Sequence, residues 1–262
     1  MIRKDQKKRP RLVDAATLAD EAPDGPPARR RNSPLNQFER AYEAIEERLI
    51  TCELKPGRFL ALQDLQDLVG FGRTPVHQAV TRLAADTLVT VHPRRGLQVA
   101  PIDLARERVL LRQRRDIERF VIRLAAEQSS ASHRNQMLHI ERYLREHRDS
   151  INLQAFNAVD RRLDSLFLAA AGEPFVDNTL RPLHTIFRRI GWLYHTQGTA
   201  RAGLVRTIDV HLAQLDAVAN RHVDAALAAC DQLVDFVDSM FDVLEREVDP
   251  SLLDCSLPPV PL

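Results

Sequence analysis

Residues 72–83 read Gly-Arg-Thr-Pro-Val-His-Gln-Ala-Val-Thr-Arg-Leu, and this stretch decides the fold of the N-terminal part of the chain. Its Thr74-Pro75 pair is typical of a helix start, because a hydroxyl can cap the first turn and proline lacks only a donor that this turn does not use. The apolar residues Val76, Val80 and Leu83 then recur at helical spacing. The stretch therefore predicts a short helix with one buried face.

The segments on both sides of this helix complete a recognisable order of elements. Before it, a helical period begins at Leu35 and stops at Lys55-Pro56-Gly57, and residues 62–69 form a second short amphipathic run. After it, residues 88–99 hold two β-prone segments around a turn that contains proline and glycine. Three helices followed by a β-hairpin predict a winged helix-turn-helix over residues 35–100.

The exposed face of the predicted helix and the tip of the predicted wing carry groups that can contact DNA. The second helix of a helix-turn-helix enters the major groove, and basic side chains on a wing can grip the minor groove or its phosphates. The candidate DNA-binding residues are Arg73, Thr74, His77, Gln78, Thr81, Arg94, Arg95 and Gly96. Ordinary solvated residues are the alternative, since residues 35–100 carry eight basic and eight acidic side chains. The order of the elements favours DNA binding.

Composition limits what the whole chain can be. Its 262 residues are 44% hydrophobic and 28% charged, which suits one or two folded domains. The longest apolar runs are too short for a membrane span, and the charged N-terminus does not fit a secretory signal. The cysteines Cys52, Cys230 and Cys255 lie too far apart for a zinc knuckle or a redox pair, and their odd number argues against a disulfide framework. We therefore expect a cytoplasmic protein that has no membrane partner.

The remaining segments divide the chain into two tails and a long helical region. Residues 1–34, with nine basic and five acidic side chains and no apolar period, predict a disordered basic tail that either attracts phosphates or is merely solvated. Residues 101–249 contain about six helical segments and predict an all-α bundle of six or seven helices. Residues 250–262 contain four prolines and predict an irregular tail. The predicted fold is therefore mainly α.

The winged-helix segment resembles the GntR family of bacterial transcription regulators. The resemblance covers Tyr42 to Ala100, and its landmarks are residues 54–57, 72–76, 79–83 and 93–99. It implies that Arg73 and Thr74 contact DNA.

This chain departs from the family pattern at several landmark positions. The family usually has serine at Gly72, arginine and glutamate at His77 and Gln78, and glycine at Thr87. An imidazole at position 77 in place of a guanidinium means that the operator need not follow the common family sequence. Arg82 aligns with a family arginine and faces either DNA or its own domain.

Residues 104–246 resemble the FCD domain, the ligand-binding domain of the FadR-type branch of this family. The resemblance implies a helical bundle whose cavity commonly holds a divalent metal and a small carboxylate effector. The family ligands are an aspartate, a histidine four residues later, and two further histidines separated by 22 positions. Asp160, Asp164, His211 and Leu233 stand at these places. The resemblance therefore implies an incomplete site for zinc, nickel or manganese at Asp160, Asp164 and His211.

The alternative is that the two aspartates pair with arginines and that His211 packs in the core. Arg114 and Arg188 are the candidate cationic partners of an anionic effector. Together these features predict a homodimeric repressor that binds palindromic operator DNA and responds to a small carboxylate. An effector-independent DNA-binding dimer is one rival. A metal-dependent helical enzyme is another, but the sequence lacks the H-E-x-x-H, Glu-x-x-His, G-x-S-x-G and phosphate-loop motifs, and we expect no enzymatic activity.

Overall fold

The computed structural model of the chain describes residues 34–197 and 204–257. These residues are mainly helical, which confirms the predicted fold class. Apart from Pro34, the predicted disordered tail over residues 1–34 lies outside the described residues. Within the described part, no helix is both long enough and apolar enough to cross a membrane.

The N-terminal part of the described chain is the predicted winged helix-turn-helix. Its elements are α1 (Pro34–Ile50), β1 (Phe59–Leu60), α2 (Leu62–Val69), α3 (Arg73–Ala85), β2 (Val89–His92) and β3 (Gly96–Val99). The predicted hairpin of β2 and β3 is present, and β1 adds a third strand on the other side of β3. β1 was not predicted, because a strand of two residues is too short to show alternation.

The six helices that follow pack into the predicted bundle. They are α4 (Leu104–Gln128), α5 (Ala131–His147), α6 (Leu153–Ala171), α7 (Pro174–Gln197), α8 (Val205–Ala219) and α9 (Val223–Glu247). Several of these helices have side-chain caps at their N-termini. The Ser130 hydroxyl accepts a hydrogen bond from the backbone N–H of His133, and the Asn152 side chain accepts one from the backbone N–H of Ala155. α6 ends at Gly172 in the left-handed conformation.

The segment after α9 differs from the predicted irregular tail over residues 250–262. Residues Pro250–Leu253 form one helical turn, α10, whose start is capped by the carboxylate of Asp249. The Leu253 carbonyl accepts a hydrogen bond of 2.8 Å from the Ile102 backbone, and the Cys255 backbone donates one of 2.8 Å to Pro56. A single turn gives no helical period, so the sequence pattern could not show it. This segment ties the end of the bundle to the winged helix.

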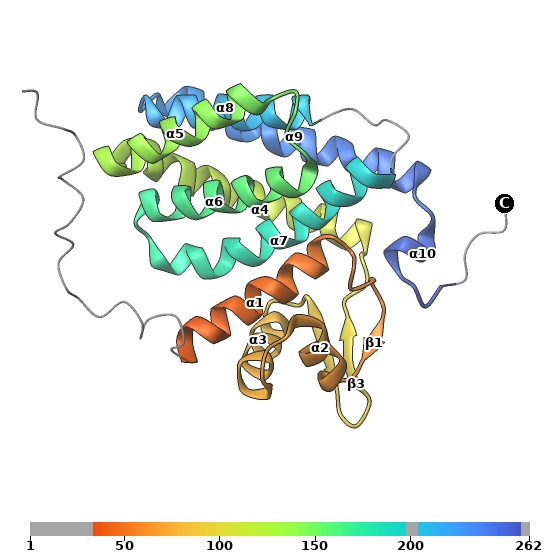
Figure 1. Cartoon of the computed structure of the whole chain (residues 1–262). Coiled ribbons are helices and arrows are strands. Elements are labelled where there is room, and N and C mark those ends of the chain that lie inside the picture. Colours follow the sequence, from red (N-terminus) through yellow and green to blue (C-terminus); the bar gives the residue numbers. More distant parts are fainter. Residues whose placement is uncertain (1–33, 198–203, 258–262) are drawn as a thin grey trace, which may run out of the picture.

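α1 and α7 connect the two parts of the molecule. α2, α3 and the sheet lie at the end of the molecule far from α5 and α8, while α1 runs beside α7 (Figure 1). A guanidinium nitrogen of Arg189 on α7 also donates 2.6 Å to the carbonyl of Ala100, at the junction of the two parts. α7 therefore contacts the winged helix at two places.

Candidate functional site

α3 presents a polar face to solvent because its apolar residues are buried against the winged helix. Pro75, Val76, Ala79, Val80 and Leu83 are buried. All five residues predicted to contact DNA from this helix are exposed: Arg73, Thr74, His77, Gln78 and Thr81. The helix begins at Arg73, so its N-cap is Gly72, which has no side chain, and the cap expected from the Thr74 hydroxyl is not formed. The first backbone N–H groups of α3 are therefore free of a side-chain cap and suited to a phosphate.

Two polar side chains on α3, Thr81 and Arg82, also have contacts within the protein. The Thr81 hydroxyl donates 2.9 Å to the carbonyl of His77. The guanidinium carbon of Arg82 lies 4.8 Å from the centre of the Tyr42 ring on α1. Arg82 thus faces its own domain, one of the two orientations that the sequence left open.

The tip of the wing is a tight turn between β2 and β3. Arg94 and Arg95 are exposed there, as predicted, and Arg94 has φ +66°. Gly96 has φ +93°, and a Cβ at this position would lie 2.6 Å from the carbonyl oxygen of Leu60 on β1. The glycine is therefore required by the packing of the sheet. Its approach to DNA stays a prediction.

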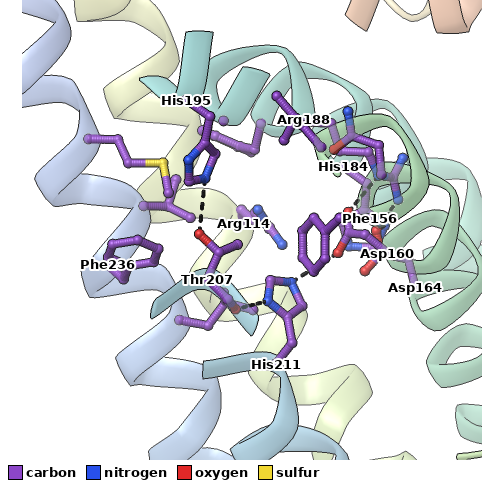
Figure 2. A pocket seen from close by; sticks show the side chains of 17 residues that line it. Arg114, Phe156, Asp160, Asp164, His184, Arg188, His195, Thr207, His211 and Phe236 are labelled. Carbon is purple, nitrogen blue, oxygen red and sulfur yellow. Dashed lines mark hydrogen bonds and ion pairs between the residues drawn. The ribbon is translucent and has the colours of Figure 1, made fainter. Parts of the chain in front are cut away.

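The bundle encloses a cavity between α4, α6, α7, α8 and α9. All five residues that the sequence named for effector or metal binding line it: Arg114, Asp160, Asp164, Arg188 and His211. Figure 2 shows the guanidinium of Arg114 near the middle of the cavity, with Phe236 on its apolar side. The cavity volume of about 60 Å³ leaves room for a small molecule of a few non-hydrogen atoms.

On one side of the cavity, Arg188 is held between the two aspartates of α6. Its Nε donates 2.7 Å to Asp160 Oδ2, and its Nη2 contacts Asp164 Oδ2. The other oxygen of Asp160, Oδ1, lies 2.9 Å from His211 Nε2. Burial alone would raise the pKa of Asp160, but the charge of Arg188 and the hydrogen bond from His211 outweigh it and hold this pKa far below its usual value. Asp160 is therefore a carboxylate with both oxygens engaged.

A second group of buried ionisable side chains continues from Asp164. His184 Nδ1 lies 3.3 Å from Asp164 Oδ2, and His184 Nε2 lies 3.2 Å from Glu118 Oε2. Glu118 also accepts 2.8 Å from Arg114 Nε. Although burial opposes ionisation, Arg114 and His184 lower the pKa of Glu118 to about 2. The arrangement is a chain of buried polar contacts from α6 through α7 to α4.

Two groups in the cavity are left for a ligand. The hydrogen bond that Arg114 makes within the described residues uses Nε, so both terminal nitrogens of its guanidinium point to the cavity without such a bond. Asn157 is 6% exposed, and its Nδ2 has no partner among the described residues. A buried amide without a partner is costly, so it indicates a place where a bound molecule accepts a hydrogen bond.

Three residues of the site were not predicted from the sequence: Asn157, Glu118 and His184. Asn157 lies one turn before Asp160 on α6, and this spacing could have placed it on the same face. His184 and Glu118 come from two other helices, and no spacing signal connects them to Asp164. Among the described residues, the His, Cys, Asp and Glu groups near enough to share a metal ion are Glu118, Asp164 and His184, whose ligand atoms lie within 4.8 Å of one another.

Two family models match the chain. The model described as "Bacterial regulatory proteins, gntR family" matches residues 37–99, and the model described as "FCD domain" matches residues 109–236. The HTH-type transcriptional repressor RspR of Escherichia coli strain K12 is 26% identical over 220 residues, which are 82% of this chain and 93% of that protein. An uncharacterised HTH-type transcriptional regulator of Streptomyces ambofaciens is 37% identical over 65 residues, 25% of this chain and 28% of that protein.

Solved structures share the fold. Escherichia coli McbR/YncC superimposes with a TM-score of 0.67 and 17% identity, over 79% of this chain and 97% of that one. A putative GntR transcriptional regulator from Rhodococcus sp. RHA1 gives a TM-score of 0.59 and 16% identity, over 78% and 97% of the two chains. At these identities the likeness concerns the fold alone.

A winged helix-turn-helix joined to an all-helical domain with an internal cavity is the architecture of a DNA-binding transcription regulator. The chain belongs to the GntR family of transcription regulators and carries an FCD domain. This family consists of regulators and not of enzymes, which agrees with the expectation from the sequence.

Proposed function

We propose that this regulator is a repressor whose affinity for its operator is lowered by a small carboxylate bound in the bundle cavity. The observation that carries the proposal is the shared helix α7: it lines the cavity with Arg188 and contacts the winged helix through Thr185 and Arg189. A ligand that binds more tightly to the arrangement of domains that does not fit DNA shifts the population toward it.

DNA recognition is assigned to the exposed face of α3 and to the wing. Arg73 at the start of the helix pairs with guanine or a phosphate, and Thr74 donates to a phosphate beside the uncapped helix end. His77 and Gln78 contact base edges, with Thr81 one turn further on. Arg94 and Arg95 hold the minor groove or its phosphates.

The effector is assigned to Arg114 and Asn157. The free terminal nitrogens of Arg114 suit the two oxygens of a carboxylate, and Asn157 Nδ2 donates one further hydrogen bond. The side chains of Phe236 and Met240 suit an apolar end of the same molecule. Arg188, which was also predicted to hold the effector, lines the cavity but is already engaged by Asp160 and Asp164. We propose that Arg188 balances the charge of these two aspartates instead of binding the effector.

The active form is assigned as a two-fold symmetric dimer. One winged helix reads only a few base pairs, and two of them on a palindromic site give useful specificity. α4 offers a surface for such a dimer, since Val109 and Phe120 are 62% and 48% exposed.

The test is a fluorescence-anisotropy titration of the full chain with DNA from upstream of its own gene, at fixed salt because phosphate contacts are salt-dependent. We expect tight binding to this DNA, with random DNA acting as only a weak competitor. We also expect one or more members of a panel of small carboxylates to weaken the binding. Equal affinity for random DNA would contradict operator recognition. Specific binding that no carboxylate changes would favour the effector-independent dimer.

A further inference from the structure

We propose that the guanidinium of Arg188 takes the place of the divalent cation in this FCD domain, so that the cavity binds its effector without a metal. The inference deepens the proposed function of the same cavity. It rests on three features of the described residues: the pairing of Arg188, the two contacts of His211, and the absence of a free ligand set in the neighbouring cluster.

The first feature is the position of Arg188. Its side chain is 7% exposed, and it bridges Asp160 and Asp164, which stand at two of the family's metal-ligand positions. A guanidinium keeps its charge when it is buried, so it supplies a permanent cation between these carboxylates. A metal that took both aspartates would leave this charge buried without its partners, which is strongly unfavourable.

The second feature is the hydrogen bonding of His211. Its Nδ1 donates 2.6 Å to the carbonyl of Thr207, and its Nε2 lies 2.9 Å from Asp160 Oδ1. Each ring nitrogen of His211 thus already has a partner within the protein, and a metal at Nε2 would have to displace Asp160. The last family ligand position holds Leu233, a buried alkyl side chain on the same cavity wall. With Arg188 in place, Asp160, Asp164 and His211 therefore do not form a metal site.

The third feature is the cluster of Glu118, Asp164 and His184. Both ring nitrogens of His184 face carboxylate oxygens, at 3.2 and 3.3 Å. Glu118 is also paired with Arg114 at 2.8 Å. Each of these candidate ligands thus already has a partner within the protein. A metal would have to displace those contacts, and it would separate Arg114 from Glu118 in a buried environment.

The consequence concerns how the effector is recognised. In a metal-holding domain, an effector carboxylate can coordinate the ion directly. Here the cations of the cavity are guanidinium groups of the chain itself, and Arg114 is the one whose terminal nitrogens remain available. Effector binding should therefore persist in a strong chelator.

The first experiment measures metal binding by the full-length parent protein. Metal content is determined after purification without chelator, and melting curves are recorded with zinc, nickel or manganese chloride and with EDTA. We expect no stoichiometric metal and an unchanged melting temperature. One equivalent of metal that is lost in Asp160→Asn would overturn the proposal, whether or not the protein binds its operator or an effector.

The second experiment asks whether a metal can replace the guanidinium. Arg188→Met leaves two buried carboxylates without their cation, so added manganese or zinc should raise its melting temperature while leaving the parent unchanged. Arg181→Met is the matched control, because Arg181 lies on the same helix with its side chain 42% exposed and should show no metal response. If added metal raises the melting temperature of the parent and of Arg188→Met equally, the proposal that the Arg188 guanidinium takes the place of a metal is contradicted. If Arg188→Met does not fold, the parent measurement decides the question.

Discussion

Thr185 on α7 donates a hydrogen bond of 2.5 Å to Glu46 on α1, and both residues are almost completely buried. Arg161 on α6 approaches the other oxygen of Glu46 at 3.4 Å. Three residues after Thr185, Arg188 faces the effector cavity. A single helix, α7, thus touches the DNA-binding part on one side and the cavity on the other, which gives the proposed regulation a short physical route.

Thr185→Val should weaken this coupling. The substitution keeps the shape of the side chain but removes the hydroxyl that donates to a buried carboxylate oxygen of Glu46. Losing this hydrogen bond should lower the free energy of unfolding by about 1–3 kcal/mol. We expect the variant to bind operator DNA while its affinity responds less to the effector. Thr196→Val is the matched control, since Thr196 on the same helix is exposed and, within the described residues, its hydroxyl donates to the carbonyl of Trp192. An unchanged effector response in Thr185→Val would exclude this contact from the coupling.

Asn157→Leu should separate ligand binding from stability. The two side chains are similar in size, and Asn157 Nδ2 has no partner within the described residues, so the free energy of unfolding of the ligand-free protein should stay the same or rise. Effector affinity should fall by about 10- to 100-fold, the value of one buried hydrogen bond to a charged group. Calorimetric titration and denaturant unfolding measure the two quantities.

A second asparagine on the same helix provides the opposite control. Asn152 caps α6 by accepting a hydrogen bond of 2.8 Å from the Ala155 backbone. Asn152→Ala should cost about 1 kcal/mol in stability and leave effector affinity unchanged. If Asn157→Leu lowers stability as much as Asn152→Ala and keeps its effector affinity, Asn157 does not contact the ligand.

Two glycine-to-serine substitutions should have opposite effects on the winged helix. Gly96→Ser forces a side chain into the left-handed region and against Leu60, so it should cost about 1–3 kcal/mol and disturb the wing. Gly72→Ser meets no atom within 4 Å and introduces a hydroxyl before α3, so it should add a few tenths of a kcal/mol. Thermal unfolding of both variants checks this, and equal stability of the two would contradict the sheet packing described for Gly96.

Arg73→Ala should reduce specific operator binding by about 1–3 kcal/mol without unfolding the protein. The residue is exposed at the first turn of α3, and its side chain forms no hydrogen bond or ion pair with the residues that the structure describes. Arg123→Ala on α4 removes an equally exposed arginine far from this surface and should bind as the parent does. The same affinity for Arg73→Ala and the parent, at matched salt, would remove Arg73 from the recognition surface.

Glu107 should make stability depend on pH. Burial raises the pKa of this carboxyl from 4.5 to about 7, and nearby Arg189 offsets only part of the effect. Between these two values the folded chain holds a proton that the unfolded chain releases, so stability falls as pH rises and the loss is complete above about pH 7, at a cost of about 3 kcal/mol. Glu107→Gln should flatten this slope in denaturant unfolding from about pH 5 to about pH 8. If the parent and Glu107→Gln show the same dependence of stability on pH, the raised pKa of Glu107 is contradicted.

The fold could be predicted largely because its signals are local. Thr74-Pro75, the period of α3 and the turn at residues 93–96 lie within a few residues of the structures they specify. β1 and α10 escaped prediction for the same reason, since elements of two and four residues carry almost no periodic signal. Their positions depend on contacts with β3 and with the loop at Pro56, which are distant in sequence.

The sequence by itself determined which side chains could gather in the bundle, because Asp160 and Asp164 share a helix face and Arg114, Arg188 and His211 stand at inward positions of their own helices. Only the tertiary structure decided their partners. Arg188 pairs with residues 24 and 28 positions away on another helix, and Glu118 meets His184 across 66 positions. Which buried charges neutralise one another depends on which helix faces meet and at what depth, and no spacing along one chain segment contains that information.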